Sequence, residues 1–506
     1  MDQEEQILKT RRNRIKEWFK NPHNLLFILI LISGFIIRLY YLYITKNQAL
    51  WWDEAEYGLR AKAFAFGTPI TGWASERELI VPIIFSFFLK IGGTEIILRI
   101  IQILISTATL AFTYFFLSKT SSKNVAIIAS CGMAFFWLHL FFTERILLYL
   151  WAPLLFLLIS YFFYTGFIHE KKRDLYLFAV FASLGLQTYF SVGFLLLGLG
   201  IYLLVIYKLE IFKMKKTWIV LGIFILIITP YAIYSQLTYG FPIPRMATGF
   251  KAATQEQGAG FFGLFAYTNM FPSRIGWIFT ILIILGLVNF IYEFFLGFGL
   301  KENIKRNENW LLIFSCFFIP LFLYTLYGVI GGSGTFYDAF ILPVFPFAFA
   351  FAGRFLDITY KLLKKYNKYL SIIIILLILF FQVYNSLQNA DNHIKASVQS
   401  YNSVKSAGLW VKENSNSNDV IVGRSIPQLT YYSERQTYDF SINSSLFQEF
   451  IQSKKPIFVI DSIWENTQPW IHQFLQENNK TFSPVIAYFL DDKKTQVSLI
   501  VYKVNF

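Results

Sequence analysis

Apolar runs of about twenty residues recur along the first 387 positions of this 506-residue chain, and they constrain its fold more than any other feature. A helix of that length is long enough to cross the hydrocarbon core of a bilayer. The chain is 55% apolar and only 15% charged, whereas soluble domains carry about 25% charged residues. The sequence therefore predicts a polytopic α-helical membrane protein, because a membrane barrel would show short alternating strands instead.

We expect about eleven spans, which follow a polar N-terminal segment. They fall near residues 25–44, 95–117, 124–142, 147–167, 174–190, 192–207, 217–237, 275–298, 309–330, 338–358 and 369–387. The run 174–207 is divided near Ser191 because its length suits two spans. The expected domains are a cytosolic basic arm (1–24), a transmembrane bundle (25–387) with an outer loop (45–93), and a C-terminal domain (388–506).

The distribution of charge orients this bundle. Residues 388–506 hold 11 Lys/Arg and 11 Asp/Glu, so the net charge of +14 belongs to the membrane part. A nucleic-acid partner is therefore not expected, since it would require a basic face on the soluble domain. With the N-terminus inside, 23 Lys/Arg fall in internal segments and nine in outer segments, as the positive-inside rule expects. We expect a multi-pass plasma-membrane protein with a cytosolic N-terminus and an extracytoplasmic C-terminal domain.

The segment 388–506 predicts a small α/β domain with a core of its own. Sequence patterns predict strands over 419–422, 430–439, 456–461, 484–490 and 496–504, and helices over 398–413, 446–452 and 465–476. This segment has no glycine-rich phosphate loop and no cluster of metal ligands. The five His residues of the chain are scattered, so a zinc site is not indicated.

The polar segment after the first span opens with Trp51-Trp52-Asp53-Glu54-Ala55-Glu56-Tyr57. Acids at the mouth of a membrane span are costly to keep without a function. Asp53 and Glu56 also have capping-box spacing. Asp53 could therefore be simply the N-cap of a helix over residues 54–66 that stops at Gly67, with no role in catalysis. Capping and catalysis are compatible, and both interpretations stay open.

We expect the helix that carries Asp53 to face the lipid headgroup layer, where a lipid-linked donor would expose its phosphate and sugar. Transfer of such a sugar with inversion requires a base for the acceptor hydroxyl and cations that stabilise the departing phosphate. Asp53 is the candidate base, Glu54 is the second candidate, and Glu56 is expected to be structural. The candidate phosphate-binding cations on the outer side are Arg38, Lys62, Arg77, Arg99 and Arg145. Trp52, Tyr57 and Glu144 are candidates for the donor or acceptor pocket. Each cation taken singly could instead form a structural ion pair.

The ordered set Ile37-Arg38-Leu39-Tyr40-Tyr41, Trp52-Asp53-Glu54-Ala55-Glu56-Tyr57, Pro82 and Leu98-Arg99-Ile100 resembles the opening of the GT-C membrane glycosyltransferases. The branch it resembles is the protein O-mannosyltransferase and aminoarabinose-transferase-like group. This resemblance implies a polyprenyl-phosphate-linked sugar donor and a catalytic centre at Asp53, with Glu54 beside it. It also implies an Arg-Tyr pair before a late span, but residues 336–340 contain no Arg. That phosphate contact is therefore either missing or supplied by Arg274 or Arg245.

The oligosaccharyltransferases form another branch of the same group. Trp51-Trp52-Asp53 echoes their Trp-Trp-Asp signature, but that signature belongs in the outer domain. No Asp-x-Asp lies near Glu144 either, so no cofactor is expected, although a divalent metal is left open.

The sequence thus predicts a membrane glycosyltransferase that moves a sugar from a polyprenyl-phosphate carrier to a protein hydroxyl, a lipid glycan or a surface polymer. A transporter or lipid flippase is the alternative, but it predicts an internal repeat and midplane polar sites that the sequence does not show. A membrane scaffold without catalysis would leave Asp53 as a helix cap alone.

Overall fold

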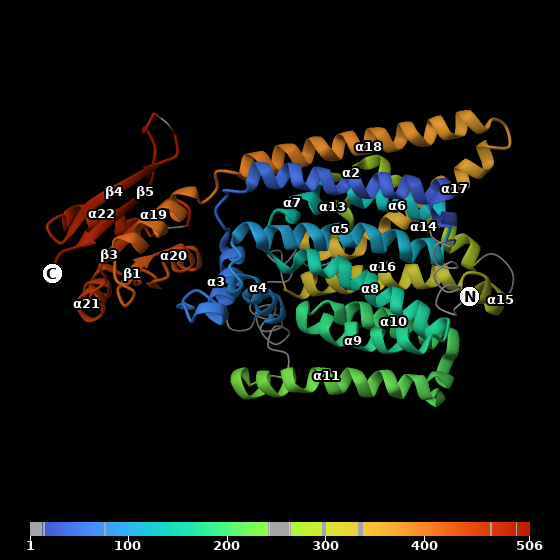
Figure 1. Ribbon diagram of the computed structural model, residues 1–506, viewed down its shortest axis with the longest axis horizontal. Coiled ribbons are helices and arrows are strands. Elements are labelled where there is room, and N and C mark those ends of the chain that lie inside the picture. The colour runs from blue at the N-terminus through green and yellow to red at the C-terminus, as the bar shows by residue number, and fades with distance from the viewer. Residues whose placement is uncertain are drawn as a thin grey trace, which may run out of the picture. The chain divides into compact units, whose positions relative to one another are not determined.

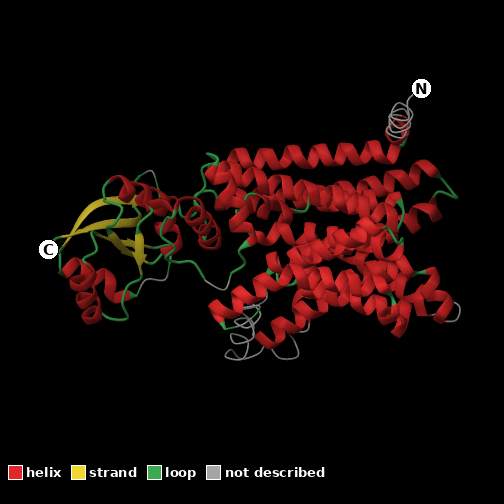
Figure 2. Ribbon diagram, turned by 60° about the horizontal axis from the view of Figure 1, so that its bottom comes forward, coloured by secondary structure: helices red, strands yellow, loops and turns green. Residues whose placement is uncertain are grey.

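The computed structural model describes residues 13, 16–74, 77–240, 242, 263, 265–295, 300–331, 337–465, 468–491 and 493–506. Within these residues, nine helices are long and apolar enough to cross a membrane, or ten if one bent pair counts as a span. The protein is therefore a multi-span helical membrane protein, as the sequence predicts (Figures 1 and 2). The predicted basic arm falls mostly outside the described residues.

Each of the eleven expected spans corresponds to a helix or a helix pair, but α9 (Lys172–Thr188), with 17 residues, is not among the ten candidate spans of the described residues. The long helices are α2 (Pro22–Thr45), α5 (Glu95–Thr120), α6 (Lys123–Ala134) with α7 (Trp137–Thr143), α8 (Trp151–Phe163), α9 (Lys172–Thr188), α10 (Val192–Tyr207), α11 (Lys215–Tyr239), α14 (Trp277–Phe295), α16 (Glu308–Gly331), α17 (Phe345–Leu363) and α18 (Lys368–Ser397). Shorter helical segments are η1 (Leu148–Leu150), η2 (Tyr164–Ile168), η3 (Lys208–Lys213), α13 (Ala266–Ile275), α15 (Leu300–Arg306) and η6 (Asp338–Val344). The expected division near Ser191 is present between α9 and α10.

The expected span 124–142 is broken. Helices α6 and α7 meet at an angle of 54°, and Phe136 between them has extended backbone angles (φ −68°, ψ 115°). A break inside a membrane leaves backbone donors that need partners. The N–H of Trp137, the first residue of α7, donates to the Ser386 hydroxyl of α18 at 2.8 Å. This polar contact from another helix supports the break.

The chain divides into two compact units. The first comprises Met1–Tyr41, Ile103–Glu144 and Leu148–His393, and the second comprises Leu42–Gln102, Arg145–Leu147 and Ile394–Phe506. The second unit therefore joins the loop after the first span to the C-terminal domain. That loop forms α3 (Trp52–Phe66) and α4 (Ile80–Lys90), and α4 is too short to span a bilayer, as expected.

Helix α17 packs inside the first unit, and its eight residues Phe345–Ala352 are all buried. Two glycines permit close approach of its neighbours. A Cβ on Gly286 of α14 would lie 2.0 Å from the Phe351 carbonyl oxygen, and a Cβ on Gly353 would lie 3.1 Å from the Val125 carbonyl oxygen of α6. Small residues at crossings allow membrane helices to pack closely, which is the main source of their association.

The second unit contains a five-stranded mixed sheet with the strand order β2-β1-β3-β5-β4. The strands are β1 (Val420–Gly423), β2 (Gln436–Tyr438), β3 (Phe458–Ser462), β4 (Phe482–Phe489) and β5 (Val497–Val504). Strand β1 pairs in parallel with β2 and β3, whereas β5 is antiparallel to β3 and β4. Val459 lies opposite Tyr502 and Ile460 opposite Val501, so alternate residues face opposite sides of the sheet.

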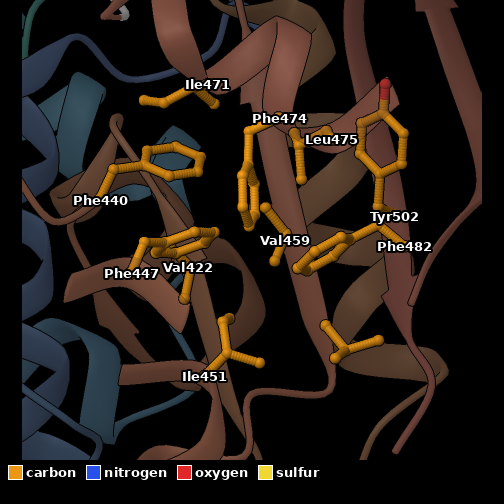
Figure 3. Packing of buried hydrophobic residues seen from close by; sticks show 11 residues of the cluster. Val422, Phe440, Phe447, Ile451, Val459, Ile471, Phe474, Leu475, Phe482 and Tyr502 are labelled. Carbon is orange, nitrogen blue, oxygen red and sulfur yellow. The ribbon is translucent and has the colours of Figure 1, made fainter. Parts of the chain in front are cut away.

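Helices cover both faces of this sheet. They are α19 (Asn402–Glu413), α20 (Ile426–Ser433), α21 (Ser444–Lys454) and α22 (Pro469–Glu477). On one face, the rings of Phe447, Phe474 and Phe482 gather beside Val459 (Figure 3). On the other face, Val404 of α19 and Leu429 of α20 pack against Ile421 and Ile460. The C-terminal part is therefore the small α/β domain that the sequence predicts.

The predicted strand over 430–439 is wrong in its first half. Residues 430–433 end helix α20, and β2 comprises only Gln436–Tyr438. Pro427 stands in the first turn of α20, where its fixed φ favours a helix. Tyr431 and Tyr432 favour a strand by their intrinsic propensity, but tertiary packing outweighs this propensity. Gly58 of α3 leaves the space that the Tyr431 ring occupies, since a Cβ there would lie 2.9 Å from the ring.

Candidate functional site

Helix α3 begins two residues earlier than predicted, and its N-cap is Trp51 rather than Asp53. Trp51 has extended backbone angles (φ −75°, ψ 173°), and its carbonyl accepts the N–H of Ala55 at 2.8 Å. Glu54 then occupies the third helical position, and its carboxylate accepts the Trp51 N–H at 3.0 Å. The helix ends at Gly67 in the left-handed region (φ 71°), as predicted. The capping role therefore belongs to Glu54, and Asp53 makes other contacts.

Glu54 is fully buried at the centre of an ionic group that we call the Glu54 cluster, which comprises Glu54, Arg99 and Arg145. Its carboxylate lies 3.3 Å from Arg145 Nη1 and 4.0 Å from Arg99 Nη1. The N–H of Ile146 also donates to it at 2.8 Å. A buried carboxylate is tolerated only with such compensation. The cluster ties α3 to α5 and to the segment 145–147.

Both arginines of the Glu54 cluster make further structural contacts. Arg99 donates to the Gln48 carbonyl at 3.0 Å, and Arg145 donates to the Ser397 hydroxyl at 3.1 Å. The Arg145 guanidinium also stacks on the Trp51 ring, 3.5 Å from its centroid. These are the structural ion pairs that the sequence left open as the alternative to a phosphate site.

Asp53 and Glu56 both meet Arg77, which follows α3 in the loop before α4. Arg77 Nη2 lies 2.7 Å from Asp53 Oδ1 and also pairs with Glu56. The side chain of Asp53 is 35% exposed, whereas those of Arg77 and Glu56 are 12% and 4% exposed. Asp53 is therefore the acid of this group that a solute reaches most readily.

The neighbours of Arg77 stabilise its positive charge. Burial lowers the pKa of its guanidinium, but Tyr57, Asp53 and Glu56 outweigh burial and raise the pKa above its ordinary value. The Arg77 guanidinium lies 5.4 Å from the centroid of the Tyr57 ring, and the Tyr57 hydroxyl donates to Glu78 at 3.4 Å. Arg77 therefore stays cationic at physiological pH. Tyr57 is buried beside it, and Trp52 is half-buried.

Lys62 joins α3 to the C-terminal domain. Its ammonium lies 3.0 Å from Glu434 Oε1 and donates to the Tyr431 carbonyl at 2.9 Å. Burial lowers the pKa of Lys62, and Glu434 opposes that effect. Glu434 also pairs with Lys412 at 2.8 Å. Lys62 thus takes part in a network within the second unit.

Arg38 belongs to the first unit and is fully buried. It donates to the Ser106 hydroxyl and the Gly34 carbonyl at 2.7 Å, and to the Ala134 carbonyl at 3.0 Å. His139 Nδ1 lies 2.9 Å from its Nη2. Intramembrane arginines are commonly satisfied in this way by the bundle interior.

Arg274 and Glu144 also belong to the first unit. Arg274 Nη2 lies 2.7 Å from Asp338 Oδ2, and its guanidinium lies 5.6 Å from the centroid of the Trp137 ring. Glu144 is buried, with 1% of its surface exposed. Arg274 and Arg38 thus have separate partners within this unit.

The sequence gives no local signal for several of the contacts that build the site. Gln48 donates to the Ser397 carbonyl at 2.6 Å, and the Leu50 N–H donates to the Tyr432 hydroxyl at 2.9 Å. Glu434 and Glu78 were not singled out either. These partners lie far apart along the chain, and no local pattern marks such pairs. Arg245 and Phe336, which entered the prediction of the phosphate contact, lie outside the described residues.

The described residues offer no evident site for a metal ion. Among the residues that the structure describes, no group of three or more His, Cys, Asp or Glu side chains could hold a metal ion.

Comparison with known protein structures identifies the class of fold. No family model and no curated protein sequence matches the chain. ArnT from Cupriavidus metallidurans, solved with bound undecaprenyl phosphate, superposes with a TM-score of 0.62 at 11% identity, over 94% of this chain and 97% of that chain. The chain has a GT-C-like fold.

A second GT-C structure agrees. The Archaeoglobus fulgidus oligosaccharyltransferase, tethered to an acceptor peptide with an NVT sequon, superposes with a TM-score of 0.62 at 12% identity. The match covers 97% of this chain and 75% of that chain. The GT-C-like fold confirms the fold class and the resemblance inferred from the first hundred residues.

Proposed function

We propose that the protein is a membrane glycosyltransferase that moves a sugar from a polyprenyl-phosphate-linked donor to an acceptor on the outer face of the plasma membrane. The observation that carries this proposal is the GT-C-like fold, shared over 94% of the chain with ArnT, which binds undecaprenyl phosphate. The acceptor is a hydroxyl of a protein, a lipid glycan or a surface polymer. The N-terminus is cytosolic in this proposal, and α3 and the C-terminal domain lie outside.

Asp53 is the proposed base. It takes the proton of the acceptor hydroxyl while the acceptor oxygen forms a bond to the anomeric carbon of the sugar. The bond between that carbon and the phosphate oxygen breaks, and polyprenyl phosphate leaves with the electron pair. The accessible edge of Asp53 and its 2.7 Å contact with Arg77 support this role, because the contact orients the carboxylate without burying it.

The departing phosphate requires a cation. Of the six candidates, Arg274 and Lys62 have the most exposed side chains, at 28% and 18%. Lys62 belongs to the same unit as Asp53, and we assign the donor-phosphate contact to Lys62. Arg38, Arg99 and Arg145 are assigned structural roles because protein groups surround their guanidinium groups. Trp52 and Tyr57, which belong to the same unit as Asp53, are assigned to the wall of the sugar pocket.

The test is Asp53→Asn in protein reconstituted into nanodiscs. Asparagine keeps the shape of the side chain and an acceptor for Arg77, but it cannot take a proton. We expect transfer to fall by about 10²- to 10⁴-fold, the usual contribution of a general base, with an unchanged melting temperature. Release of polyprenyl phosphate from synthetic polyprenyl-phosphate hexoses and pentoses measures the rate, with cell-envelope extract as acceptor.

Asp439→Asn is the matched control, since Asp439 is also a partly exposed aspartate paired with an arginine, Arg424, at 3.2 Å in the same unit. It should keep the full transfer rate. If purified Asp53→Asn transferred sugar as fast as the wild type, the assignment of the base would be wrong.

A further inference from the structure

A cavity of about 290 Å³ lies at one end of the first unit, among α2, α6, α17 and α18. Figure 1 shows α2 and α18 side by side, and both helices begin at this end of the bundle. The polar part of the lining consists of His23, Asn124, Asp357 and Tyr360. The rest is apolar, and the wall from α18 consists of Ile372, Ile375, Leu376 and Leu379. The proposed sugar transfer uses none of these residues.

The apolar wall is as long as one leaflet of a bilayer is deep. Helix α18 begins at Lys368, and Leu379 at the far end of the wall lies eleven residues later. At a rise of roughly 1.5 Å per residue this distance is about 16 Å, and half of a hydrocarbon core of about 30 Å is about 15 Å. The four residues of the wall follow three- and four-residue steps, so they share one face of α18. The wall therefore suits one chain of a lipid in a single leaflet.

The cavity opens on the surface of the bundle that meets lipid. Leu26 of α2 and Leu376 of α18 line the cavity and are also 44% and 58% exposed. Ile128 of α6 and Leu356 of α17 line it as well, and both are buried. Cavities with apolar walls of this kind stay dry and take apolar ligands. A lipid chain can thus enter between α2 and α18 and lie against α6 and α17.

Protein groups already satisfy the polar end of the cavity. His23 Nε2 lies 2.9 Å from Asn124 Oδ1, and Asn124 Nδ2 donates to Asp357 Oδ1 at 2.7 Å. The other oxygen of Asp357 accepts from the Ser122 hydroxyl at 3.1 Å and pairs with Lys361 at 2.9 Å. A buried carboxylate with this many partners is compensated. Its charge therefore does not exclude an anion from the neighbourhood.

Lysines gather at this polar end. The segment 361–368, which joins α17 to α18, holds four Lys and no Asp or Glu, and all four lysines are exposed. Two of them contact residues of the cavity. Lys361 pairs with Asp357, and Lys364 Nζ lies 5.7 Å from the centroid of the Tyr360 ring. Basic residues at the ends of membrane helices attract the headgroups of anionic lipids.

We propose that this cavity binds an anionic phospholipid of the phosphatidylglycerol type. One acyl chain lies in the cavity against the apolar wall of α18, and the phosphate lies beside the lysines of segment 361–368. The site joins a dry apolar strip to a basic end, and a lipid of this type has the same two parts in the same order. This inference is independent of the proposed sugar transfer, because the two sites share no residue.

Other ligands fit less well. The headgroup of a zwitterionic phospholipid would bring a second cation to the lysines and gain less from them. A soluble anion would use the lysines but would leave the apolar wall uncovered. An uncharged lipid would cover the wall but would gain nothing from the lysines.

The experiment is a thermal unfolding titration of the full chain in mild detergent. Dioctanoyl phosphatidylglycerol should raise the melting temperature in a saturable way, since a ligand of the folded state stabilises it. Dioctanoyl phosphatidylcholine, which has the same chains, should raise it much less. Lys364→Gln should weaken phosphatidylglycerol binding by about fivefold, the effect of one lysine near a lipid headgroup. Lys305→Gln, which removes an exposed lysine of α15, should leave the titration unchanged.

A second variant tests the apolar wall. Leu376→Trp places a larger side chain in the cavity and should weaken phosphatidylglycerol binding by about tenfold, the effect of displacing about two methylene groups. Ile373→Trp is the matched control, since Ile373 is also an exposed residue of α18, at 52%, but is outside the cavity lining. It should bind the lipid as the wild type does. The melting temperature of each variant without lipid shows whether it is folded, and either variant tests the site if the other misfolds.

Four results would overturn the proposal. The first is equal stabilisation by the two dioctanoyl lipids, and the second is undiminished phosphatidylglycerol binding by both Lys364→Gln and Leu376→Trp. The third is stabilisation by soluble glycerophosphoglycerol as strong as that by the lipid, which would show that the apolar wall is not used. The fourth is stronger stabilisation by farnesyl phosphate than by phosphatidylglycerol, which would assign the cavity to an isoprenoid phosphate instead.

Discussion

Asp53 and Glu54 are neighbours in the sequence, but the structure places them in opposite environments. Glu54 is fully buried and meets two arginines and two backbone N–H groups. The side chain of Asp53 is 35% exposed and lies beside Arg77, which it shares with Glu56. One residue step along a helix turns the side chain by about 100°, so adjacent acids face different surroundings. Adjacent positions in one motif can thus separate a buried anchor from an accessible acid.

The largest stability effect should come from Glu54→Gln. This substitution leaves Arg99 and Arg145 buried without their carboxylate, which typically costs about 3–5 kcal/mol. The melting temperature of the purified protein would fall sharply. Asp53→Asn, at the partly exposed neighbour, should change the stability by less than about 1 kcal/mol. Equal melting temperatures for the two variants would break the contrast between the buried anchor and the accessible acid.

Arg77→Gln tests whether Asp53 depends on its arginine. The substitution removes the cation between Asp53 and the buried Glu56, and an unpaired buried group costs about 1–3 kcal/mol. We expect a lower melting temperature and a transfer rate reduced by about 10- to 100-fold, because the base is no longer oriented. Arg77→Lys should restore part of both. A variant with wild-type transfer would show that Asp53 is positioned without Arg77.

The network of Lys62, Glu434 and Lys412 should give a smaller, pH-dependent effect. Burial raises the pKa of Glu434, but Lys412 and Lys62 outweigh burial and lower the pKa below its ordinary value. Its contribution to stability is complete above the ordinary glutamate pKa of about 4.3 and is lost as the pH falls through the lower folded-state value.

Glu434→Gln should therefore lower the melting temperature near neutral pH and flatten its fall as the pH drops below the ordinary glutamate pKa of about 4.3. Melting curves across this range, with the wild type alongside, measure the difference. Superimposable curves would show that this network contributes no stability.

The smallest effect is expected at Asp439. Its pair with Arg424 is partly exposed on both sides, with side chains 46% and 27% exposed. Exposed pairs contribute about 0–1 kcal/mol, so Asp439→Asn should leave the melting temperature nearly unchanged. A loss as large as that of Glu54→Gln would mean that exposure is a poor guide to the role of an acid in this protein.

Much of the fold was predictable because it depends on patterns a few residues long. Apolar runs predicted the helices of the bundle, and the glycine at position 67 predicted where α3 ends. The prediction was wrong where local signals compete. Capping-box spacing at Asp53 and Glu56 coincides with a second candidate box at Trp51 and Glu54, and burial of Glu54 against two arginines decides between them.

The sequence by itself determined the membrane class, the α/β character of the C-terminal part and the acids to examine. The spacing of apolar residues and the composition carry that information, because each helix or strand must turn its apolar residues toward the protein core or the lipid. Only the tertiary structure decided which acid is anchored and which is accessible. Glu54 meets Arg145, and Arg145 meets Ser397, through contacts that join distant parts of the chain. Such contacts depend on how the chain folds back on itself, so no stretch of sequence contains them.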